Sequence, residues 1–375
     1  MVYFDARQLR HSNSIRILAL TKYARLGASS RMRTWQYLPF LEKEGFEITV
    51  QPLLSDELLR LRYQRGFYGI AALSRAYADR CKNLLQCRKF DIVWIEKEAL
   101  PWWPLWTERA LLRGVPYVLD YDDAIFHNYD RHASSWVRRI YRRRLDGLMA
   151  GSALVIGGNR YLAKRAMDAG ATWVEVVPTV IDLARYPVPA KTQTVDGAPD
   201  TLPRIVWIGS PSTVHYLHLI GEALQAVAEQ NPFVLRIIGG SKIGLPGVPV
   251  EAMTWSEATE TENIRGCAVG IMPLLDSPWE RGKCGYKLIQ YMACGLPVVA
   301  SGVGGNPEIV KSGENGFIAN NTDDWVNALQ RLLGDRLLCA RMGASGRRRV
   351  EETYCLQQTG PVVAGLLRTV VARHH

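Results

Sequence analysis

Two patterns of apolar residues alternate along the first half of the chain. Short uninterrupted apolar runs are typical of buried strands, and longer stretches with apolar positions every three or four residues are typical of helices. Stretches 31–43 and 57–86 are of the helical kind. Strands that alternate with helices predict βαβ units and a parallel sheet. The strands predicted here lie at 15–20, 46–50, 92–95, 117–120, 153–156 and 174–177.

The alternation stops at 187–203, a segment rich in proline and small polar residues, as is typical of a linker. It resumes beyond that segment, and two of the later strands run into glycine. From residue 324 onward the pattern is largely helical. The later strands are predicted at 204–209, 234–240, 269–272 and 297–300, with a helix at 216–230.

A chain of 375 residues exceeds one ordinary core and fits two domains. We therefore predict an α/β protein with two Rossmann-like domains that face a central cleft. The predicted parts are an N-terminal domain over 1–186, a linker over 187–203, a C-terminal domain over 204–355 and a C-terminal helix over 356–375.

The composition narrows the class of protein. A hydrophobic fraction of 47% and a charged fraction of 22% are those of a globular protein. No apolar window approaches about 18 residues, which argues against a transmembrane helix. Residues 1–7 lack the pattern of a secretory signal, so we expect a cytoplasmic location. Seven cysteines without CxxC spacing argue against a disulfide framework and a zinc site.

The net charge of +10 is concentrated in the first half, notably at 138–139 and 142–144. Nucleic acid, an anionic membrane surface or a polyanionic substrate could each complement this charge, and a solvated helix face is the alternative. Trp102, Trp103 and Trp106 lie among prolines close to this basic stretch. They fit either a membrane interface or an ordinary core.

The most informative stretch is 284–317, where a glycine turn, a short helix, a buried strand and a second glycine-rich loop follow one another. Lys287 lies at the start of the helix and Gln290 one turn later on the same face. A lysine at the positive end of a helix, beside glycines that admit a ligand, suits a nucleotide diphosphate and its departure. A solvated surface lysine is the alternative.

Two strand ends in the second half carry small polar residues or glycines. Gly209, Ser210, Ser212 and Thr213 follow one strand, where backbone N–H groups and hydroxyls suit a phosphate, although Ser and Thr are also common helix caps. Gly239–Gly240 ends the next strand, where it could pass beneath the base or ribose of a bound nucleotide. An ordinary turn is the alternative.

Charged residues also follow the strands of the first half. Asp122, Asp123 and His127 form a loop that could position an acceptor hydroxyl, or cap a helix. Arg31 and Arg33 follow the first strand and could reach a phosphate, with a surface helix start as the alternative. Glu96 closes another strand and could line the acceptor pocket.

Residues 204–320 resemble the donor half of the retaining, family-4 type glycosyltransferases of the glycosyl transferases group 1, which have the GT-B fold. The resemblance rests on 290–300, 304–308 and 315–316, and 177–182 resembles the segment that precedes the linker. It implies that protein cations rather than a metal neutralise the diphosphate, so no metal and no cofactor are expected. It also implies a C-terminal helix able to return to the N-terminal domain. The donor-binding residues then expected are Gly209, Ser210, Ser212, Thr213, Gly239, Gly240, Lys283, Gly285, Tyr286, Lys287 and Gln290.

The chain departs from the family pattern at several positions. Gln290 stands where the family has a second glutamate, and Gly282 where it has an acidic residue eight positions earlier. Glu280 or Asp276 is a candidate replacement for that acid. The family's Lys or Arg after the first strand of this domain is missing from 209–216. Its charge would have to come from Lys287, Lys283 or Arg281.

The resulting expectation is an enzyme that moves a sugar from a nucleoside-diphosphate sugar to a carbohydrate or lipid-linked acceptor with retention. Lys287 would stabilise the departing diphosphate, and Asp122, Asp123 and His127 would orient the acceptor hydroxyl. The expected setting is surface polysaccharide or glycolipid assembly on the cytoplasmic face of the inner membrane, without nucleic acid. A nucleotide-sugar epimerase of the same fold and a non-catalytic glycan or nucleotide-sugar binding protein are the alternatives. A dinucleotide-dependent oxidoreductase is weaker, because no complete GxGxxG follows the first strand.

Overall fold

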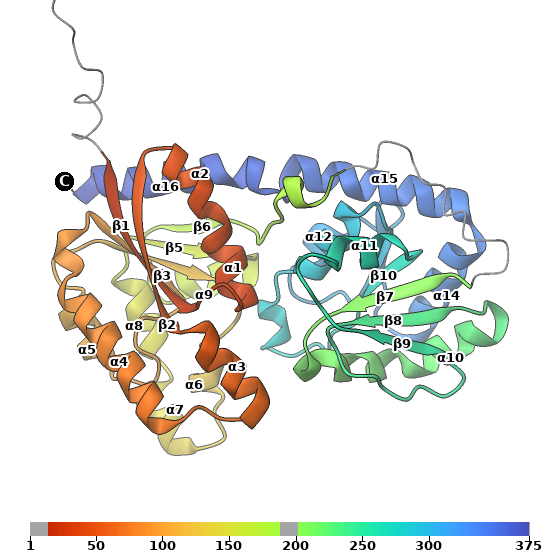
Figure 1. Cartoon of the computed structure of the whole chain (residues 1–375), viewed down its shortest axis with the longest axis horizontal. Coiled ribbons are helices and arrows are strands. Elements are labelled where there is room, and N and C mark those ends of the chain that lie inside the picture. The colour runs from red at the N-terminus through yellow and green to blue at the C-terminus, as the bar shows by residue number, and fades with distance from the viewer. Residues whose placement is uncertain (1–13, 188–201, 375) are drawn as a thin grey trace, which may run out of the picture. The chain divides into compact units, whose positions relative to one another are not determined.

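The computed structural model describes residues 14–187 and 202–374, which divide into two compact units. Unit 1 holds the described residues up to Pro178 together with those from Thr359 onward, and unit 2 is Thr179–Gln358. Each unit is built on one six-stranded parallel sheet (Figure 1), which confirms the α/β prediction. The predicted linker at 187–203 lies mostly outside the described residues, and the predicted domain limits remain predictions.

The sheet of unit 1 has the strand order β2-β1-β3-β4-β5-β6, and all six predicted strands are present. The strands are β1 (Ile15–Tyr23), β2 (Phe46–Leu54), β3 (Ile92–Glu96), β4 (Tyr117–Tyr121), β5 (Leu154–Gly157) and β6 (Val174–Val176). The helices are α1 (Ala28–Arg33), α2 (Leu38–Lys43), α3 (Asp56–Arg65), α4 (Ile70–Leu85), α5 (Leu105–Leu111), α6 (His127–Asp130), α7 (Ser135–Tyr141), α8 (Arg144–Ala150) and α9 (Arg160–Asp168), with 3-10 turns η1 (Trp35–Tyr37) and η2 (Cys87–Lys89).

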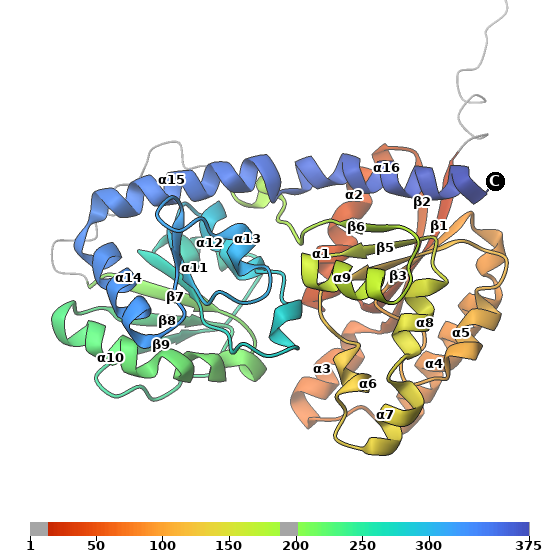
Figure 2. The ribbon, with the colours of Figure 1, turned by 180° about the vertical axis from the view of Figure 1, so that it is seen from behind.

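The sheet of unit 2 has the order β12-β11-β10-β7-β8-β9, the doubly wound order of nucleotide-binding sheets. Its strands are β7 (Arg204–Ile208), β8 (Val234–Ile238), β9 (Val250–Met253), β10 (Val269–Met272), β11 (Val298–Ala300) and β12 (Gly316–Ile318). Its helices are α10 (Gly221–Gln230), α11 (Glu260–Arg265), α12 (Tyr286–Ala293), α13 (Asn306–Ile309), α14 (Thr322–Gly334) and α15 (Arg336–Thr353), with 3-10 turns η3 (Leu183–Arg185), η4 (Pro211–Ile220) and η5 (Glu280–Gly282). Helices α10 and α14 pack together over one face of the sheet, and α11 and α12 over the other (Figures 1 and 2).

In each sheet the chain reverses its direction of progress at one place, between β1 and β3 in unit 1 and between β7 and β10 in unit 2. Ligands of open parallel sheets bind at the carboxyl ends of the strands at such a point. In unit 2 the buried Tyr291 of α12 bridges the point, because its hydroxyl accepts from the Ile208 N–H and donates to the Ile271 carbonyl. Gly270 makes room for the ring, since a Cβ there would lie 2.3 Å from it.

The last helix, α16 (Leu356–His374), belongs to unit 1 from Thr359 onward. The hydroxyls of Thr359 and Tyr37 lie 2.8 Å apart, and Gly360 packs against the ring of Phe40. Arg368 donates to the carbonyl of Glu44 at 2.7 Å. The predicted return of the C-terminal helix to the N-terminal domain is therefore confirmed.

Two details of unit 2 differ from the sequence prediction. The helix expected at 216–230 is α-helical only from Gly221, and 211–220 forms a 3-10 turn instead. That segment begins with proline and contains Ser, Thr, Val and His, which favour the α-helix less than Ala or Leu do. Strands β9 and β12 were not predicted, because both are short strands at sheet edges and lack a long apolar run.

Helix α15 approaches the turn after α12 so closely that only glycine fits at position 343. A Cβ there would lie 1.9 Å from the Gly295 carbonyl oxygen. We expect Gly343→Ala to lower the free energy of unfolding by about 1–3 kcal/mol, because the backbones must separate. Urea unfolding measures the loss. Gly334→Ala, at a position with no neighbour within 4 Å, is the control and should change stability by less than about 0.5 kcal/mol. Equal stability of the two variants would contradict this account of the packing.

Candidate functional site

Lys287 is a cation in unit 2 without an acidic partner. Its Nζ lies 4.0 Å from the centre of the Trp207 ring, and no hydrogen bond or ion pair joins it to any residue within 14–187 or 202–374. Burial, followed by the nearby charge of Lys283, lowers the pKa of Lys287 to about 7. An anionic ligand would restore the charge of this ammonium and remove the cost of its burial.

Gly209, directly after β7, makes room for the ammonium of Lys287 and for the Trp207 ring. A Cβ at that position would lie 2.7 Å from Lys287 Nζ and 2.4 Å from the Trp207 ring. Beyond Gly209, the hydroxyls of Ser210 and Ser212 lie 2.8 Å apart, and Thr213 donates to the Ser210 carbonyl. Ser210 caps no helix with its side chain, so these exposed hydroxyls can bond a ligand.

Two glycine-rich segments set the backbone around Lys287. Gly285, with φ of 66°, is the N-cap of α12, so a residue without a side chain precedes Tyr286 at the positive end of that helix. Gly304 has φ of 62°, and a Cβ there would lie 2.7 Å from the Lys283 carbonyl. The second glycine-rich loop therefore packs beneath the segment that carries Lys283 and Lys287.

A hollow of about 410 Å³ lies next to Gly209, at the ends of β8 and β9. Gly239, with φ of 79°, approaches the Gly209 carbonyl and Trp255 so closely that a Cβ would clash with both. Glycine at 239 therefore allows the ends of β7 and β8 to pack closely beside Trp255, which lines the hollow. The hollow is lined by Pro211, Gly239, Gly240, Ser241, Ala252, Met253, Thr254 and Trp255.

Two polar residues of the motif region face inward. The amide of Gln290 donates to the Tyr186 hydroxyl at 3.2 Å, and Tyr186 donates to Glu260 at 2.7 Å. The carboxylate of Glu280 accepts from Tyr216 and Ser277. The structure therefore brings Lys283, Lys287 and the 209–213 loop to one edge of the sheet. The side chains of Gln290 and Glu280 form hydrogen bonds with other residues of unit 2.

In unit 1 the reversal point between β1 and β3 carries a second cation, Lys97. Its Nζ lies 2.8 Å from Asp122, 3.7 Å from Asp123 and 3.8 Å from Glu96. It also donates to the Ser29 hydroxyl, whose oxygen lies 2.5 Å from Asp122 and 2.9 Å from Glu96 and can donate its single proton to either carboxylate. Residues that follow three different strands thus form one buried charge cluster.

Pairing outweighs burial in this cluster. Burial opposes the charge of Lys97, but Asp122, Asp123 and Glu96 together raise its pKa. Burial likewise opposes ionisation of Asp122, yet Lys97 and the Ser29 bond lower its pKa to about 2. Lys97 also holds a left-handed backbone with φ of 65°, uncommon for a residue with a side chain. The cluster is a preorganised polar surface with Asp122 ionised at neutral pH.

The other predicted residues of unit 1 make internal contacts. The ring nitrogens of His127 lie 2.8 Å from Asp130 and 2.9 Å from the Tyr161 hydroxyl, so this imidazole is not part of the Lys97 cluster. Arg33 is buried against Asp120 and donates to the Val177 carbonyl. Arg31 donates to the carbonyl of Arg25 at 3.2 Å. Across 14–187 and 202–374, no group of three or more His, Cys, Asp or Glu residues is arranged to hold a metal ion.

The sequence predicts an acceptor pocket lined from residues 96–98 and a phosphate contact from 27–33, but it assigns no role to Lys97 or Ser29 themselves. A signal was present, because Ser29 follows the first strand and Lys97 directly follows the strand at 92–95. Its meaning depends on β1 and β3 being neighbours in the sheet, which the alternation of strands and helices does not specify.

The comparison with protein families concerns the same unit as Lys287. Residues 202–335 match the family described as glycosyl transferases group 1. The matched segment agrees with the resemblance noted over 204–320. It includes Gly209, the hollow beside it and Lys287.

Curated relatives match parts of the chain. Spore coat protein SA of Bacillus subtilis (strain 168) is 25% identical over 174 residues, which are 41% of this chain and 45% of that protein. D-inositol 3-phosphate glycosyltransferase of Rhodococcus opacus (strain B4) is 39% identical over 69 residues, 18% of this chain and 16% of that protein. The chain thus spans less than half the length of these relatives.

A solved structure matches the fold over nearly the whole chain. Anabaena Alr3699/HepE, crystallised in complex with UDP, superposes with a TM-score of 0.69 at 15% identity, over 95% of this chain and 100% of that one. The fold is therefore GT-B, and the segment that matches the family, 202–335, lies in its second Rossmann-like part.

The Lys97 cluster predicts a pH-dependent stability. We expect Lys97→Met to lower the free energy of unfolding by about 3–5 kcal/mol near pH 7, because it removes the cation that pairs with Asp122, Asp123 and Glu96. The loss should shrink toward pH 4, because in the variant, which lacks Lys97, these carboxylates take up protons at a higher pH than in the unaltered protein. In the unaltered protein, the stability due to ionised Asp122 is present above its ordinary pKa of 3.8 and is lost as pH falls toward about 2.

Urea unfolding at pH 4 and pH 7 measures both effects. Lys164→Met is the control, because Lys164 forms an exposed pair with Asp168 in the same unit. It should change stability by less than about 0.5 kcal/mol at either pH. A Lys97→Met loss that is small, or independent of pH, would mean that the cluster is not a buried charge network.

Proposed function

We propose that the protein transfers a sugar from a nucleoside-diphosphate sugar to a carbohydrate or lipid-linked acceptor, with retention at the anomeric carbon. The observation that carries the proposal is Lys287, an unpaired ammonium at the reversal point of a doubly wound sheet. In this proposal its charge neutralises the diphosphate as it departs, which is the principal catalytic task in such a transfer.

The surroundings of Lys287 support a nucleotide donor. The hydroxyls of Ser210, Ser212 and Thr213 can bond phosphate oxygens, and the hollow beside Gly239 and Trp255 can hold a base. Lys283, beside the helix N-cap Gly285, adds a second cation. The solved neighbour was crystallised with UDP, and another structure of the same Anabaena protein holds UDP-glucose. We therefore propose a nucleoside-diphosphate sugar as donor.

On the acceptor side we propose the edge of unit 1 around Lys97. Asp122 and Asp123 offer carboxylate oxygens that an acceptor hydroxyl can donate to, and Lys97 holds Asp122 ionised. Names of relatives, including a phosphatidylinositol monomannoside mannosyltransferase of Mycolicibacterium smegmatis, make a lipid-linked acceptor in surface polysaccharide or glycolipid assembly a reasonable proposal. We propose the cytoplasmic face of the inner membrane as the place of that assembly.

One observation keeps a binding protein as the second candidate. The two acidic positions of the family hold Gly282 and Gln290, and the Gln290 amide is directed to Tyr186. A binder would hold a nucleotide sugar without turnover, and an epimerase would convert the donor without any acceptor. Incubation of the donor alone, and then with saccharide or lipid-linked acceptors, separates these three activities.

The first experiment is a thermal-shift panel with the diphosphates of uridine, guanosine, adenosine and thymidine and their sugars. A ligand that binds the native state raises the melting temperature, by an amount that grows with its concentration relative to Kd. We expect one base to raise it clearly more than the others. No shift with any nucleotide would overturn the proposal.

Lys287→Met should reduce transfer at least about 100-fold, the effect typical of a lost electrostatic contact to a developing oxyanion. The fold should survive, because the removed ammonium forms no hydrogen bond or ion pair with a described residue, and its one contact among them is with the Trp207 ring. Lys311→Met, at an exposed lysine of the same unit, is the control and should keep normal activity. Steady-state transfer assays and melting temperatures measure both variants. Near-normal transfer by Lys287→Met would remove the assigned role.

Nucleotide binding should also take up a proton. Free Lys287, with a pKa of about 7, is mostly neutral at pH 8, and a bound diphosphate should return it to the charged form. Calorimetry in buffers of different ionisation enthalpy should therefore give an uptake of nearly one proton at pH 8, and much less at pH 6. The Lys287→Met variant should show none at pH 8. Equal proton uptake by the variant and the parent would show that a group other than Lys287 takes up the proton.

A further inference from the structure

Unit 1 exposes large apolar side chains that the proposed transfer does not use. Trp102 and Trp103 lie in the loop after β3, Trp106 on α5, and Trp136 and Ile140 on α7. Their exposed fractions are 47%, 38%, 71%, 71% and 65%. Tryptophan is highly buried on average, so four exposed indoles require an explanation. We call these five residues the tryptophan surface.

Ring contacts join the loop to α7. The Trp102 ring lies 5.8 Å from His132 and 6.4 Å from Tyr141, the last residue of α7. Trp136 and Ile140 are four residues apart on that helix and therefore share one side of it. No residue of α7 is fully buried, so this helix lies at the surface of unit 1.

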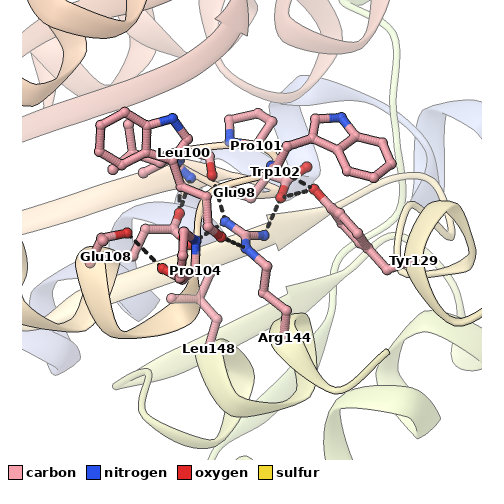
Figure 3. A network of polar contacts seen from close by, with 12 residues as sticks. Glu98, Leu100, Pro101, Trp102, Pro104, Glu108, Tyr129, Arg144 and Leu148 are labelled. Atoms are coloured by element: carbon pink, nitrogen blue, oxygen red, sulfur yellow. Dashed lines mark hydrogen bonds and ion pairs between the residues drawn. The ribbon is translucent and has the colours of Figure 1, made fainter. Parts of the chain in front are cut away.

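A buried charge network fixes the loop that carries Trp102 and Trp103 (Figure 3). Arg144 pairs with the carboxylates of Glu98 and Glu108. The same guanidinium donates to the carbonyls of Leu100 and Trp103 at 2.7 and 2.6 Å. The backbone N–H of Trp102 donates to the Tyr129 hydroxyl. Five groups of one loop and its surroundings are thus held by a single arginine and a tyrosine.

The backbone of Trp102 is strained. Its φ of 65° lies in the left-handed region, which bulky residues rarely adopt. Strain of this kind persists where the surrounding structure enforces it and is concentrated at functional positions. The loop is therefore built to present Trp102 and Trp103 at the surface.

The tryptophan surface is surrounded by positive charge. Arg131, Arg139, Arg142 and Arg143 are exposed, and none forms an ion pair with another described residue. The acids nearest in sequence pair elsewhere, because both Asp130 and Asp146 contact Arg165. None of the four exposed indole N–H groups donates to a residue among the described ones. Free indole donors and unpaired arginines together suit a layer that is apolar on one side and anionic on the other.

We infer that the tryptophan surface docks unit 1 on an anionic phospholipid bilayer, with the indoles at headgroup depth and the arginines on lipid phosphates. Such binding combines apolar burial with attraction to anionic lipid. Among the described helices, none is long and apolar enough to cross a bilayer. Figures 1 and 2 place α3 at the same end of unit 1 as α7. Tyr63 on α3 and Phe67 and Ile70 after it are exposed apolar residues as well. The inference does not depend on the proposed transfer reaction.

Sedimentation with lipid vesicles tests the inference. The full chain should bind vesicles that contain phosphatidylglycerol, bind pure phosphatidylcholine at least about tenfold more weakly, and lose affinity as salt rises. The double variant Trp106→Ser with Trp136→Ser should bind the anionic vesicles about tenfold more weakly. The triple variant Arg139→Gln, Arg142→Gln and Arg143→Gln should lose most of the preference for anionic lipid.

The control is Leu337→Ser, which removes an apolar side chain of unit 2 that is 83% exposed, and it should bind like the parent. All altered side chains are exposed, and unchanged melting temperatures and nucleotide shifts would show that the variants fold. Absence of binding to anionic vesicles, or unchanged binding by the Trp106/Trp136 variant, would overturn the inference. So would binding to heparin without binding to vesicles, since the surface would then recognise a soluble polyanion. A failure of the transfer reaction would leave these vesicle results unaffected.

Discussion

A half-buried ammonium group that has no carboxylate beside it is costly, and Lys287 is such a group. Its place depends on much of unit 2: the Trp207 ring below it, the missing side chain at Gly209, and an α12 that begins at the left-handed Gly285. Helix α12 is in turn fixed by Tyr291 across two strands and by the close approach of α15. The packing of unit 2 therefore holds Lys287 at a position that lowers the stability of the fold. Such costs are common at sites that bind a charged ligand.

The two reversal points have opposite electrostatics. In unit 1 the carboxylates around Lys97 satisfy its charge within the protein, so that edge is preorganised and nearly complete without a ligand. In unit 2, Lys287 lies near a second cation, Lys283, and no carboxylate is among the groups that shift the pKa of Lys287. A neutral hydroxyl compound suits the first environment and a polyanion the second. This difference, more than any single contact, distinguishes the proposed acceptor side from the proposed donor side.

The sequence was sufficient for the fold and for part of the site. Buried strands read clearly because both faces of a parallel sheet are covered, whereas the edge strands β9 and β12 left only weak runs. Lys287 could be found because its glycines and its helix are local in sequence. The directions of Gln290, His127 and Arg33 could not be predicted, because each depends on a partner from a distant segment: Tyr186, Tyr161 and Asp120. Lys97 was hidden for a related reason, since its cluster exists only once the strand order is known.

The return of α16 to unit 1 has a consequence for biosynthesis. Unit 1 consists of one segment that is made early and another that is made after the whole of unit 2. The intervening Thr179–Gln358 takes on the order of 10–40 s to translate at ordinary rates of about 5–20 residues per second. During that time Tyr37 and Phe40 lack the helix that later packs against them. The N-terminal unit can therefore complete its packing only after unit 2 has been synthesised, an exception to the usual order in which domains mature from the N-terminus.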